Sequence, residues 1–495
     1  MVSMIYFAVN LIISFVARSL FIHYLGVEYN GINSLFGSVI SMLSIAELGF
    51  GNAIIFSMYK PLADENVEKI KSLMRFYKHI YEIVAGVVFI LGMIIMPFIP
   101  TFVGKIDVDV NLHWAFFLTL MGTVSSYLFT YNRSLVIADQ KNYIITWCDI
   151  FYKIILFLVQ TLILVKTRNF GLYLLMQIIC TILENVVITI IAKKKYPYLN
   201  EQSTKLNKTD VISIMTKVKG LLFHKVASFV VLGTDSLLIS KFCGVIDVGL
   251  YGNYTILINA LNSVWTLVSS SISASIGNLL ATSDHKKSYA VYQKARFAQV
   301  WITNFLAVTA FCLIQPFIKL WLGKQYLLSM TTVVVLILNF YLQVNRKMLN
   351  NFKETAGIYY EDRFVPVIEA TVNFLLSIVL GYKLGIAGIL LATISSTLFV
   401  VYGYGYPKYV YQVIFKQSTK HYFKELTEDI FVFLVILLIT NSLVSLVQIN
   451  NLFLQIAVKL LLCTGIVNGL LLMIFWRNDN FTYWKKKALA ILQKN

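Results

Sequence analysis

Apolar windows of about 20 residues recur along the whole sequence, and each is long enough to cross a bilayer as a helix. The chain has 495 residues, of which 58% are hydrophobic and 13% charged, and its mean hydropathy is +0.73. A soluble protein of this length could not bury so much apolar surface. No A-x-A cleavage site follows the first window, 4–25, so we expect it to be a retained membrane helix.

We therefore expect an all-α polytopic membrane protein with about fourteen transmembrane helices. Closed hydrogen bonding in lipid favours helices, and a β-barrel would show short alternating segments instead. The expected spans are 4–25, 33–57, 77–103, 113–137, 144–166, 170–192, 219–243, 250–276, 296–322, 326–346, 361–383, 386–408, 425–447 and 452–476.

The placement of the charges predicts the orientation. Loops after the even-numbered spans, with the span edges, hold 31 of the 42 Lys and Arg residues, and the other loops hold 7. The positive-inside rule then places both termini in the cytoplasm. Because these charges lie between apolar spans, the net charge of +18 does not indicate a nucleic-acid partner. We expect a bacterial plasma-membrane protein in contact with membrane lipids.

Short motifs recur in order at offsets of 210 to 226 residues, which indicates an internal duplication. "YLGVEYNG" (24–31) matches "FCGVIDVG" (242–249), and "NR" at 132–133 matches "NR" at 345–346. Six helices per half return the chain to the same side, so the two lobes should be parallel repeats around a central cavity. The expected domains are 1–195, a basic linker 196–218, 219–410, and helices 13 and 14 with a basic tail in 411–495.

Polar residues in the first two helices of each half are candidates for the walls of this cavity, because they are costly in lipid. Asn10, Ser14 and Arg18 recur every four residues, and Asn259, Asn262 and Thr266 follow one helical stripe. Ser41 lies on a polar face of the second span. The alternative is close helix packing through small residues.

Ionisable residues at membrane depth give three further candidates. Arg18 could bind an anionic headgroup, because a guanidinium holds phosphate in a bidentate way, or it could form an ion pair. Lys153 and Glu184 should lie at one depth on adjacent helices, which favours a structural salt bridge that Asp149 could share. Glu47, beside Gly49 and Gly51, suggests a structural or gating role at a flexible point of its helix. Pairing of Glu47 with Arg18 would have to span a depth offset of about 10 Å.

A possible cation site is a fourth candidate. Asp235, Asn373 and Thr393 should lie at similar depth, with Glu369 one turn deeper. Their carboxylate, amide and hydroxyl oxygens suit Na⁺, and a carboxylate alone suits a proton. Interhelical hydrogen bonding is the alternative reading.

The sequence lacks the motifs of several common enzyme chemistries. The sequence has no GxxxxGK[ST], HExxH, CxxC or GxSxG motif, so we expect neither ATP hydrolysis nor another enzyme activity, and no cofactor or metal. The five cysteines share no metal or redox spacing and read as small buried hydrophobic residues.

The segment "YLGVEYNGINSLFGSVISMLSIAELGFGNAIIFSMYKPLADEN" (24–66) resembles the N-terminal signature of bacterial polysaccharide flippases. It carries LG-x-x-x-x-G at 25–31, A-E-L-G-x-G at 46–51 and Y-K-P-L at 59–62. These Wzx-type proteins, which act in O-antigen, capsule and exopolysaccharide synthesis, belong to the multidrug/oligosaccharidyl-lipid/polysaccharide exporter superfamily. The resemblance implies a MATE-like fold and flipping of undecaprenyl-pyrophosphate-linked oligosaccharide to the outer leaflet by alternating access. It also implies contact with the polysaccharide polymerase machinery.

Two other readings stay open. A cation-coupled drug antiporter would share the fold, and the family signature favours the flippase over it. A membrane enzyme of polysaccharide assembly would need a sizeable outer loop, and the longest expected outer loop, near 100–113, has only about a dozen residues.

Overall fold

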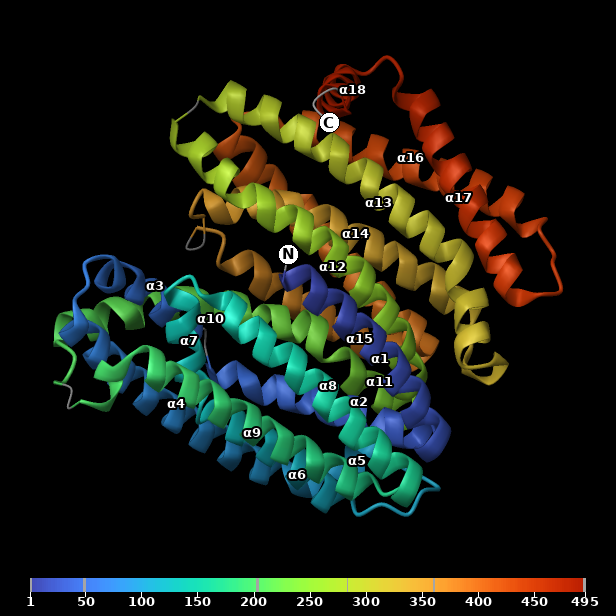
Figure 1. Ribbon diagram of the computed structural model, residues 1–495. Helices are drawn as coiled ribbons and strands as arrows, with labels where there is room; N and C mark the ends of the chain where they lie inside the picture. The colour runs from blue at the N-terminus through green and yellow to red at the C-terminus, as the bar shows by residue number, and fades with distance from the viewer. Residues whose placement is uncertain (1, 48–49, 202–203, 283, 359–360, 493–495) are drawn as a thin grey trace. The chain divides into compact units, whose positions relative to one another are not determined.

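The computed structural model describes residues 2–47, 50–201, 204–282, 284–358 and 361–492, which form helices and short connections without any β-strand (Figure 1). The expected all-α, MATE-like fold class is confirmed. The chain forms two compact units, Met1–Gly252 and Asn253–Asn495.

The first unit contains eleven labelled α-helices and the start of a twelfth. They are α1 (Val2–Leu25), α2 (Val27–Leu43), α3 (Phe50–Ala63), α4 (Val67–Ile95), α5 (Ile99–Val103), α6 (Leu112–Tyr127), α7 (Thr130–Ala138), α8 (Asn142–Thr167), α9 (Phe170–Lys195), α10 (Lys208–Gly233) and α11 (Asp235–Cys243). The pairs α1 and α8, α8 and α9, and α6 and α9 pack along their lengths.

The second unit begins within α12 (Val245–Thr282). It continues with α13 (His285–Trp321), α14 (Met330–Thr355), α15 (Phe364–Ser396), the π-helix η5 (Thr397–Ile414), α16 (Thr419–Ser445), α17 (Leu452–Phe475) and α18 (Asp479–Leu492). Helix α13 packs against α14, α16 and α17. The short α18 is the amphipathic end of the described chain, and its Trp484 indole N–H donates to the Lys294 carbonyl at 2.9 Å.

Asparagine caps fix where three helices of the first unit begin. The side-chain oxygens of Asn66, Asn111 and Asn169 accept the backbone N–H three residues further on, at 3.0, 3.0 and 2.9 Å. Each bond satisfies one of the N–H groups left open at a helix start, and loss of such a cap costs about 1 kcal/mol. Asn111 and Asn169 thereby fix the ends of α6 and α9.

Four expected spans are interrupted in the structure. The second span is divided into α2, a 3₁₀ turn at Ser44–Glu47, and α3. The third is interrupted at Met96–Phe98, where proline removes a backbone donor. Helices α6 and α7 meet at an angle of 43°, and α10 and α11 are separated at Thr234. Hydropathy predicts such spans as single segments because it does not register local changes of backbone direction.

Helix α15 contains a reversal that separates the eleventh and twelfth expected spans. Gly385 has φ 58° and ψ −137°, a conformation that glycine adopts without the Cβ penalty. The two arms approach closely, because a Cβ on Gly388 would lie 2.0 Å from the Leu380 carbonyl oxygen. The arms therefore form a tight helical hairpin.

Glycines of the internal repeat meet at one helix crossing in the first unit. Gly26 and Gly244 precede α2 and α12 with nearly the same backbone angles, φ 96° and ψ 175° against φ 102° and ψ 166°. A Cβ on Gly31 would lie 1.9 Å from the carbonyl oxygen of Val245, and one on Gly249 would lie 2.7 Å from that of Val27. The reciprocal contacts relate α2 to the start of α12 by a local pseudo-two-fold axis.

By length and hydropathy, eight helices of the described chain qualify as membrane spans, or nine if α6 and α7 count together. This number is lower than fourteen because 364–414 counts as one span although it has two arms, and because interrupted or more polar helices, such as α14, do not qualify. Every expected span nevertheless coincides with a helix, an interrupted helix, the first arm of α15, or the second arm of α15 together with the start of η5.

The boundary between the compact units falls after Gly252 and not in the basic segment 196–218. Helix α10 packs against α2 and α3, and α11 packs against α2 and α5. These contacts place both helices in the first unit. Compactness does not define which helices move together, so the expected lobe boundaries stay a prediction.

Candidate functional site

Arg18 is a membrane-depth cation whose hydrogen-bonding capacity is incompletely used. It lies on α1, on the same helical face as the partly buried Asn10 and Ser14. Its Nη1 is buried and has no hydrogen-bond partner in the described part of the chain. A buried donor without a partner costs about 1–3 kcal/mol, and more when it is charged. An anionic ligand or water at Nη1 would remove this cost.

Glu47 lies at the interruption between α2 and α3, where it accepts a hydrogen bond from the Tyr81 hydroxyl at 2.7 Å. Tyr77 lies beside Tyr81 and bonds Ser134 of α7 at 3.1 Å. A Cβ on Gly51 would come within 3.0 Å of both the Glu47 Oε1 and the Tyr81 hydroxyl. The glycine thus permits the close approach of α3 to this network, while Gly49 lies outside the described residues.

The Glu47 network also corrects one sequence-based possibility. No Glu47–Arg18 ion pair forms among the described residues, where Glu47 takes Tyr81 as its partner and the Arg18 Nη1 takes none. The gating role of Glu47 stays a prediction. Glu47 lies at a helix interruption and is held by the hydrogen bond from Tyr81 of α4, a place where a change of contact would alter the path of the helix.

Glu184 has a different partner from the one expected. Arg133 of α7 donates from Nη2 to Glu184 at 3.0 Å and from Nη1 to Asp149 at 2.6 Å. Lys153 does not provide the countercharge for Glu184, so the expected Lys153–Glu184 bridge is wrong. Lys153 lies one turn beyond Asp149 on α8, whereas Arg133 reaches both carboxylates from α7. Asp149, which was expected to be able to share the bridge, does bond the same cation as Glu184.

The expected cation ligands of the second unit divide into two sets. Asn373 donates to the Thr393 hydroxyl at 3.0 Å, so the α15 hairpin brings these two residues together. Glu369 is held in a bidentate pair by Arg346 at 2.8 and 3.1 Å and accepts from Thr397 at 3.0 Å. A carboxylate occupied in this way is an ion-pair partner and not an open cation ligand, which corrects the role expected of Glu369.

Asp235 is the first residue of α11 and belongs to the first compact unit. Its side chain is buried, and its Oδ1 has no hydrogen-bond partner in the described part of the chain. The partial positive charge of a helix N-terminus favours a carboxylate there. Asp235 as a coupling residue stays a prediction, as does its grouping with Asn373 and Thr393.

Of the expected stripe on α12, Asn262 has a partner that sequence reasoning missed. The Lys347 ammonium of α14 donates to its side-chain oxygen at 3.0 Å. Asn259 and Thr266 are exposed, as is Ser41 on α2. The hydroxyls of Ser41 and Thr266 donate to backbone carbonyls four residues earlier, so they need no further partner. Their place in a water-filled cavity stays a prediction.

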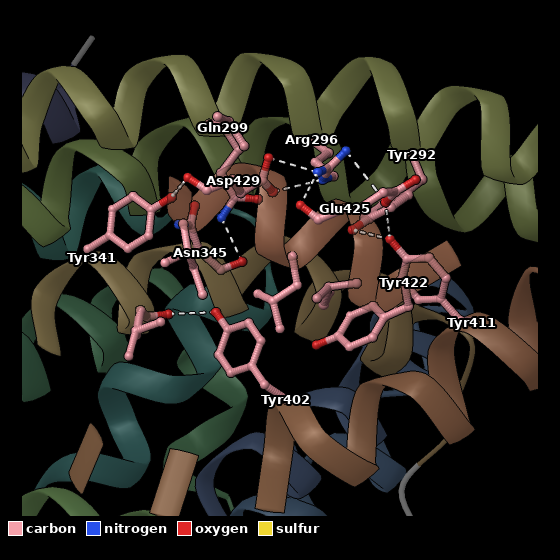
Figure 2. Close-up of a pocket in the computed structure, with 15 residues that line it drawn as sticks. Tyr292, Arg296, Gln299, Tyr341, Asn345, Tyr402, Tyr411, Tyr422, Glu425 and Asp429 are labelled. Carbon is pink, nitrogen blue, oxygen red and sulfur yellow. Dashed lines mark hydrogen bonds and ion pairs between the residues drawn. The ribbon is translucent and has the colours of Figure 1, made fainter. Parts of the chain in front are cut away.

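A second network missed by sequence reasoning joins α13 to α16 (Figure 2). Arg296 bonds Asp429 at 2.7 and 3.0 Å and lies 3.4 Å from a Glu425 oxygen. The Tyr411 hydroxyl donates to Glu425 at 2.6 Å. A small cavity of about 30 Å³ lies among these groups, which is room for one or two waters. The network attaches α16 to α13 through satisfied charges, so we assign it a structural role.

A signal for these missed arginines was present in the sequence. Arg133 and Arg346 are the second residues of the repeated "NR" motif, and each forms an ion pair with a carboxylate on a neighbouring helix. Arg296 and Asp429 also both lie near the predicted cytoplasmic ends of their spans, 296–322 and 425–447. Among the described residues, no three His, Cys, Asp or Glu side chains are arranged to hold a metal ion.

The fold is shared with transporters of the MOP exporter superfamily. The lipid II flippase MurJ, in its inward closed conformation, matches over 96% of this chain and 98% of its own, with a TM-score of 0.67 and 13% identity. An inward-facing multidrug resistance MATE transporter matches with a TM-score of 0.60 and 12% identity over 79% of this chain and 92% of its own. The MATE transporter VcmN of Vibrio cholerae matches with a TM-score of 0.58 and 13% identity over 80% and 92%.

The sequence itself matches no protein-family model and no curated protein. At 12–13% identity the structural matches establish the fold alone. The match to MurJ leaves only 4% of the chain uncovered, which is less than the length of α16 to α18. The likeness to MurJ therefore extends into these C-terminal helices.

Proposed function

We propose that this protein flips an undecaprenyl-pyrophosphate-linked oligosaccharide from the cytoplasmic to the outer leaflet for surface polysaccharide biosynthesis. The observation that carries the proposal is the near-complete match to the lipid II flippase fold, which covers 96% of the chain. The flippase-like segment 24–66 supports the same reading. Alternating access between the two repeats would move the headgroup, while the lipid tail stays in the bilayer.

Arg18 supplies the chemistry that such a substrate needs. A guanidinium can donate two parallel hydrogen bonds to a phosphate and keeps its charge at every physiological pH. The buried and unpartnered Nη1 gives Arg18 an unused donor at membrane depth. We assign Arg18 to the pyrophosphate group, with Asn10 and Ser14 on the same face of α1.

The proposal includes a location and partners. We place the protein in the bacterial plasma membrane with both termini in the cytoplasm, where it would deliver its product to a polysaccharide polymerase. Coupling to Na⁺ or a proton would act through Asp235. Surface polysaccharide requires outward transfer of its repeat units, so loss of the protein should trap lipid-linked units inside the cell.

A deletion strain tests the proposal directly. We expect loss of surface polysaccharide and accumulation of lipid-linked oligosaccharide, with both restored by the wild-type gene. Arg18→Ala should restore little, and Arg18→Lys an intermediate amount, because lysine keeps the charge without the bidentate geometry. Lys459→Ala on α17 is the matched control and should restore the wild-type level.

The MATE likeness favours a second candidate, a cation-coupled drug antiporter, because two such structures share the fold with TM-scores of 0.58 and 0.60. The same deletion strain separates the two functions. Unchanged surface polysaccharide with increased drug sensitivity would refute the flippase proposal and support the antiporter.

A further inference from the structure

A cavity of about 500 Å³ opens in the first unit where α2, α6 and α9 begin. Its walls come from the loops that lead into α6 and α9, from the first turns of these two helices, and from the first turn of α2. By the predicted orientation these segments lie on the outer side of the membrane. The lining includes Tyr29, Asp109, Asn111, Trp114, Arg168 and Asn169.

The aromatic part of the wall is accessible. Trp114 is 53% exposed, and Gly171 lies against its indole ring, since a Cβ there would be 3.8 Å from the indole nitrogen. The absence of a side chain at Gly171 keeps space open beside the ring. Tyr29 lines the same cavity and donates its hydroxyl to the Asp109 carbonyl at 3.2 Å.

The two charged residues of the wall, Asp109 and Arg168, form no ion pair within the described part of the chain. In the described part of the chain, the Asp109 carboxylate forms no ion pair. The Arg168 guanidinium likewise has no carboxylate partner there, and its one contact of note is with the Tyr24 ring, 5.9 Å from its centroid. Opposite charges thus line one cavity without pairing. A ligand there can meet both an acceptor and a cationic donor.

The two helix-capping asparagines add further donors. Asn111 and Asn169 use their side-chain oxygens to cap α6 and α9. Their amide nitrogens form no hydrogen bond with other described groups. The caps also fix the positions of both side chains at the rim, which lowers the entropy that binding would cost.

We propose that this cavity binds sugar residues of the oligosaccharide after it reaches the outer side. Sugar hydroxyls both donate and accept hydrogen bonds, which matches a carboxylate beside amide and guanidinium donors. The C–H faces of a pyranose ring carry positive partial charge and fit against the negative face of an aromatic ring. A purely apolar drug would leave Asp109 and Arg168 unpaired, and a simple anion would be opposed by Asp109.

This inference rests on the proposed function, and its test has a separate readout. The probe is the free repeat-unit oligosaccharide, released by depolymerising the surface polysaccharide of the host strain. Binding to the full-length protein in nanodiscs is measured by calorimetry. We expect Trp114→Ala to bind about tenfold more weakly, the order of effect that loss of one stacked aromatic contact produces. Trp114→Phe should keep most of the binding.

Matched controls exclude a general effect on folding. Asp109→Asn should weaken binding, whereas Asp107→Asn in the same loop should not, because Asp107 does not line the cavity. Trp147→Ala removes a comparably exposed tryptophan from α8 and should bind like the wild type. Elution in size-exclusion chromatography and thermal stability are recorded for every variant.

The outcomes distinguish the two proposals. Equal oligosaccharide binding by the wild type, Trp114→Ala and Asp109→Asn would overturn the sugar site, as would a wild type that restores surface polysaccharide but binds no oligosaccharide. Trp114→Ala and Asp109→Asn could instead lose binding of a short-chain phospholipid and keep wild-type binding of the oligosaccharide. That result would identify a lipid headgroup as the occupant and would also overturn the sugar site. Failure of the wild-type gene to affect surface polysaccharide would refute the proposed function itself.

Discussion

Removal of the Glu369 carboxylate from its pair with Arg346 should strongly destabilise the second unit. Two hydrogen bonds of 2.8 and 3.1 Å join the pair, and Thr397 adds a third at 3.0 Å. The Arg346 side chain is only 18% exposed and the Glu369 side chain only 4%. Glu369→Ala deletes all three bonds and leaves a buried guanidinium without a countercharge, which typically costs about 3–5 kcal/mol.

A double variant separates this structural effect from a role in cation coupling. Arg346→Met with Glu369→Leu removes both charges, and replacing a whole buried pair by apolar residues is often neutral or stabilising. We therefore expect thermal unfolding in detergent to occur at a much lower temperature for Glu369→Ala and near the wild-type temperature for the double variant. Complementation of the deletion strain should follow the same order.

Glu428→Ala, which removes a carboxylate 59% exposed, should change stability by less than about 1 kcal/mol. If Glu369→Ala is as stable as the wild type, the ion pair does not have the assigned structural weight. If the double variant is stable but inactive, one or both side chains act in transport, and the structural interpretation of Glu369 is wrong.

Three further substitutions test other parts of the structure. Glu47→Gln weakens a charge-assisted hydrogen bond and should reduce complementation without reducing the yield of folded protein; wild-type flipping would contradict the gating role. Gly31→Ala places a methyl group against the Val245 carbonyl oxygen, 1.9 Å away, and should sharply lower folded yield, whereas Gly37→Ala, with open space around its Cβ, should not. Asp235→Asn should lower transport and its dependence on Na⁺ or pH; equal transport with and without Na⁺, and at each pH, in both variant and wild type would refute coupling there.

Hydropathy predicted where the helices lie because burial in lipid depends on the average polarity of about 20 residues. It did not predict where helices are interrupted, since an average over about 20 residues does not register the local change from α-helix to 3₁₀ turn at Ser44–Glu47. Glu184 was expected level with Lys153, with Asp149 one turn away, and the two carboxylates do share one cation. The cation, Arg133, was not predicted, because pairing depends on the rotation of each helix and on the position of α7.

In the α15 hairpin, too, the position of a residue along its helix was predictable from the sequence, whereas its partner was not. Asn373 and Thr393 were expected at one depth, and the structure joins them because both lie ten residues from position 383, near the reversal. Glu369 and Thr397 lie fourteen residues from the same point and also bond. A short turn between two helices thus fixes which residues face each other, provided that the sequence position of the turn is known. Gly385 was the available signal.

The internal repeat preserves backbone geometry more strictly than it preserves charge pairing. Gly31 and Gly249 lie at a crossing where neither can carry a side chain, so substitution there would force the helices apart. Arg133 and Arg346 are also repeat-related, yet the first pairs with two carboxylates and the second with one. A long side chain such as that of arginine can reach different partners without any change of the backbone. The two halves therefore share a fold but have different electrostatic properties, so equivalent positions should not be assigned equivalent roles in transport.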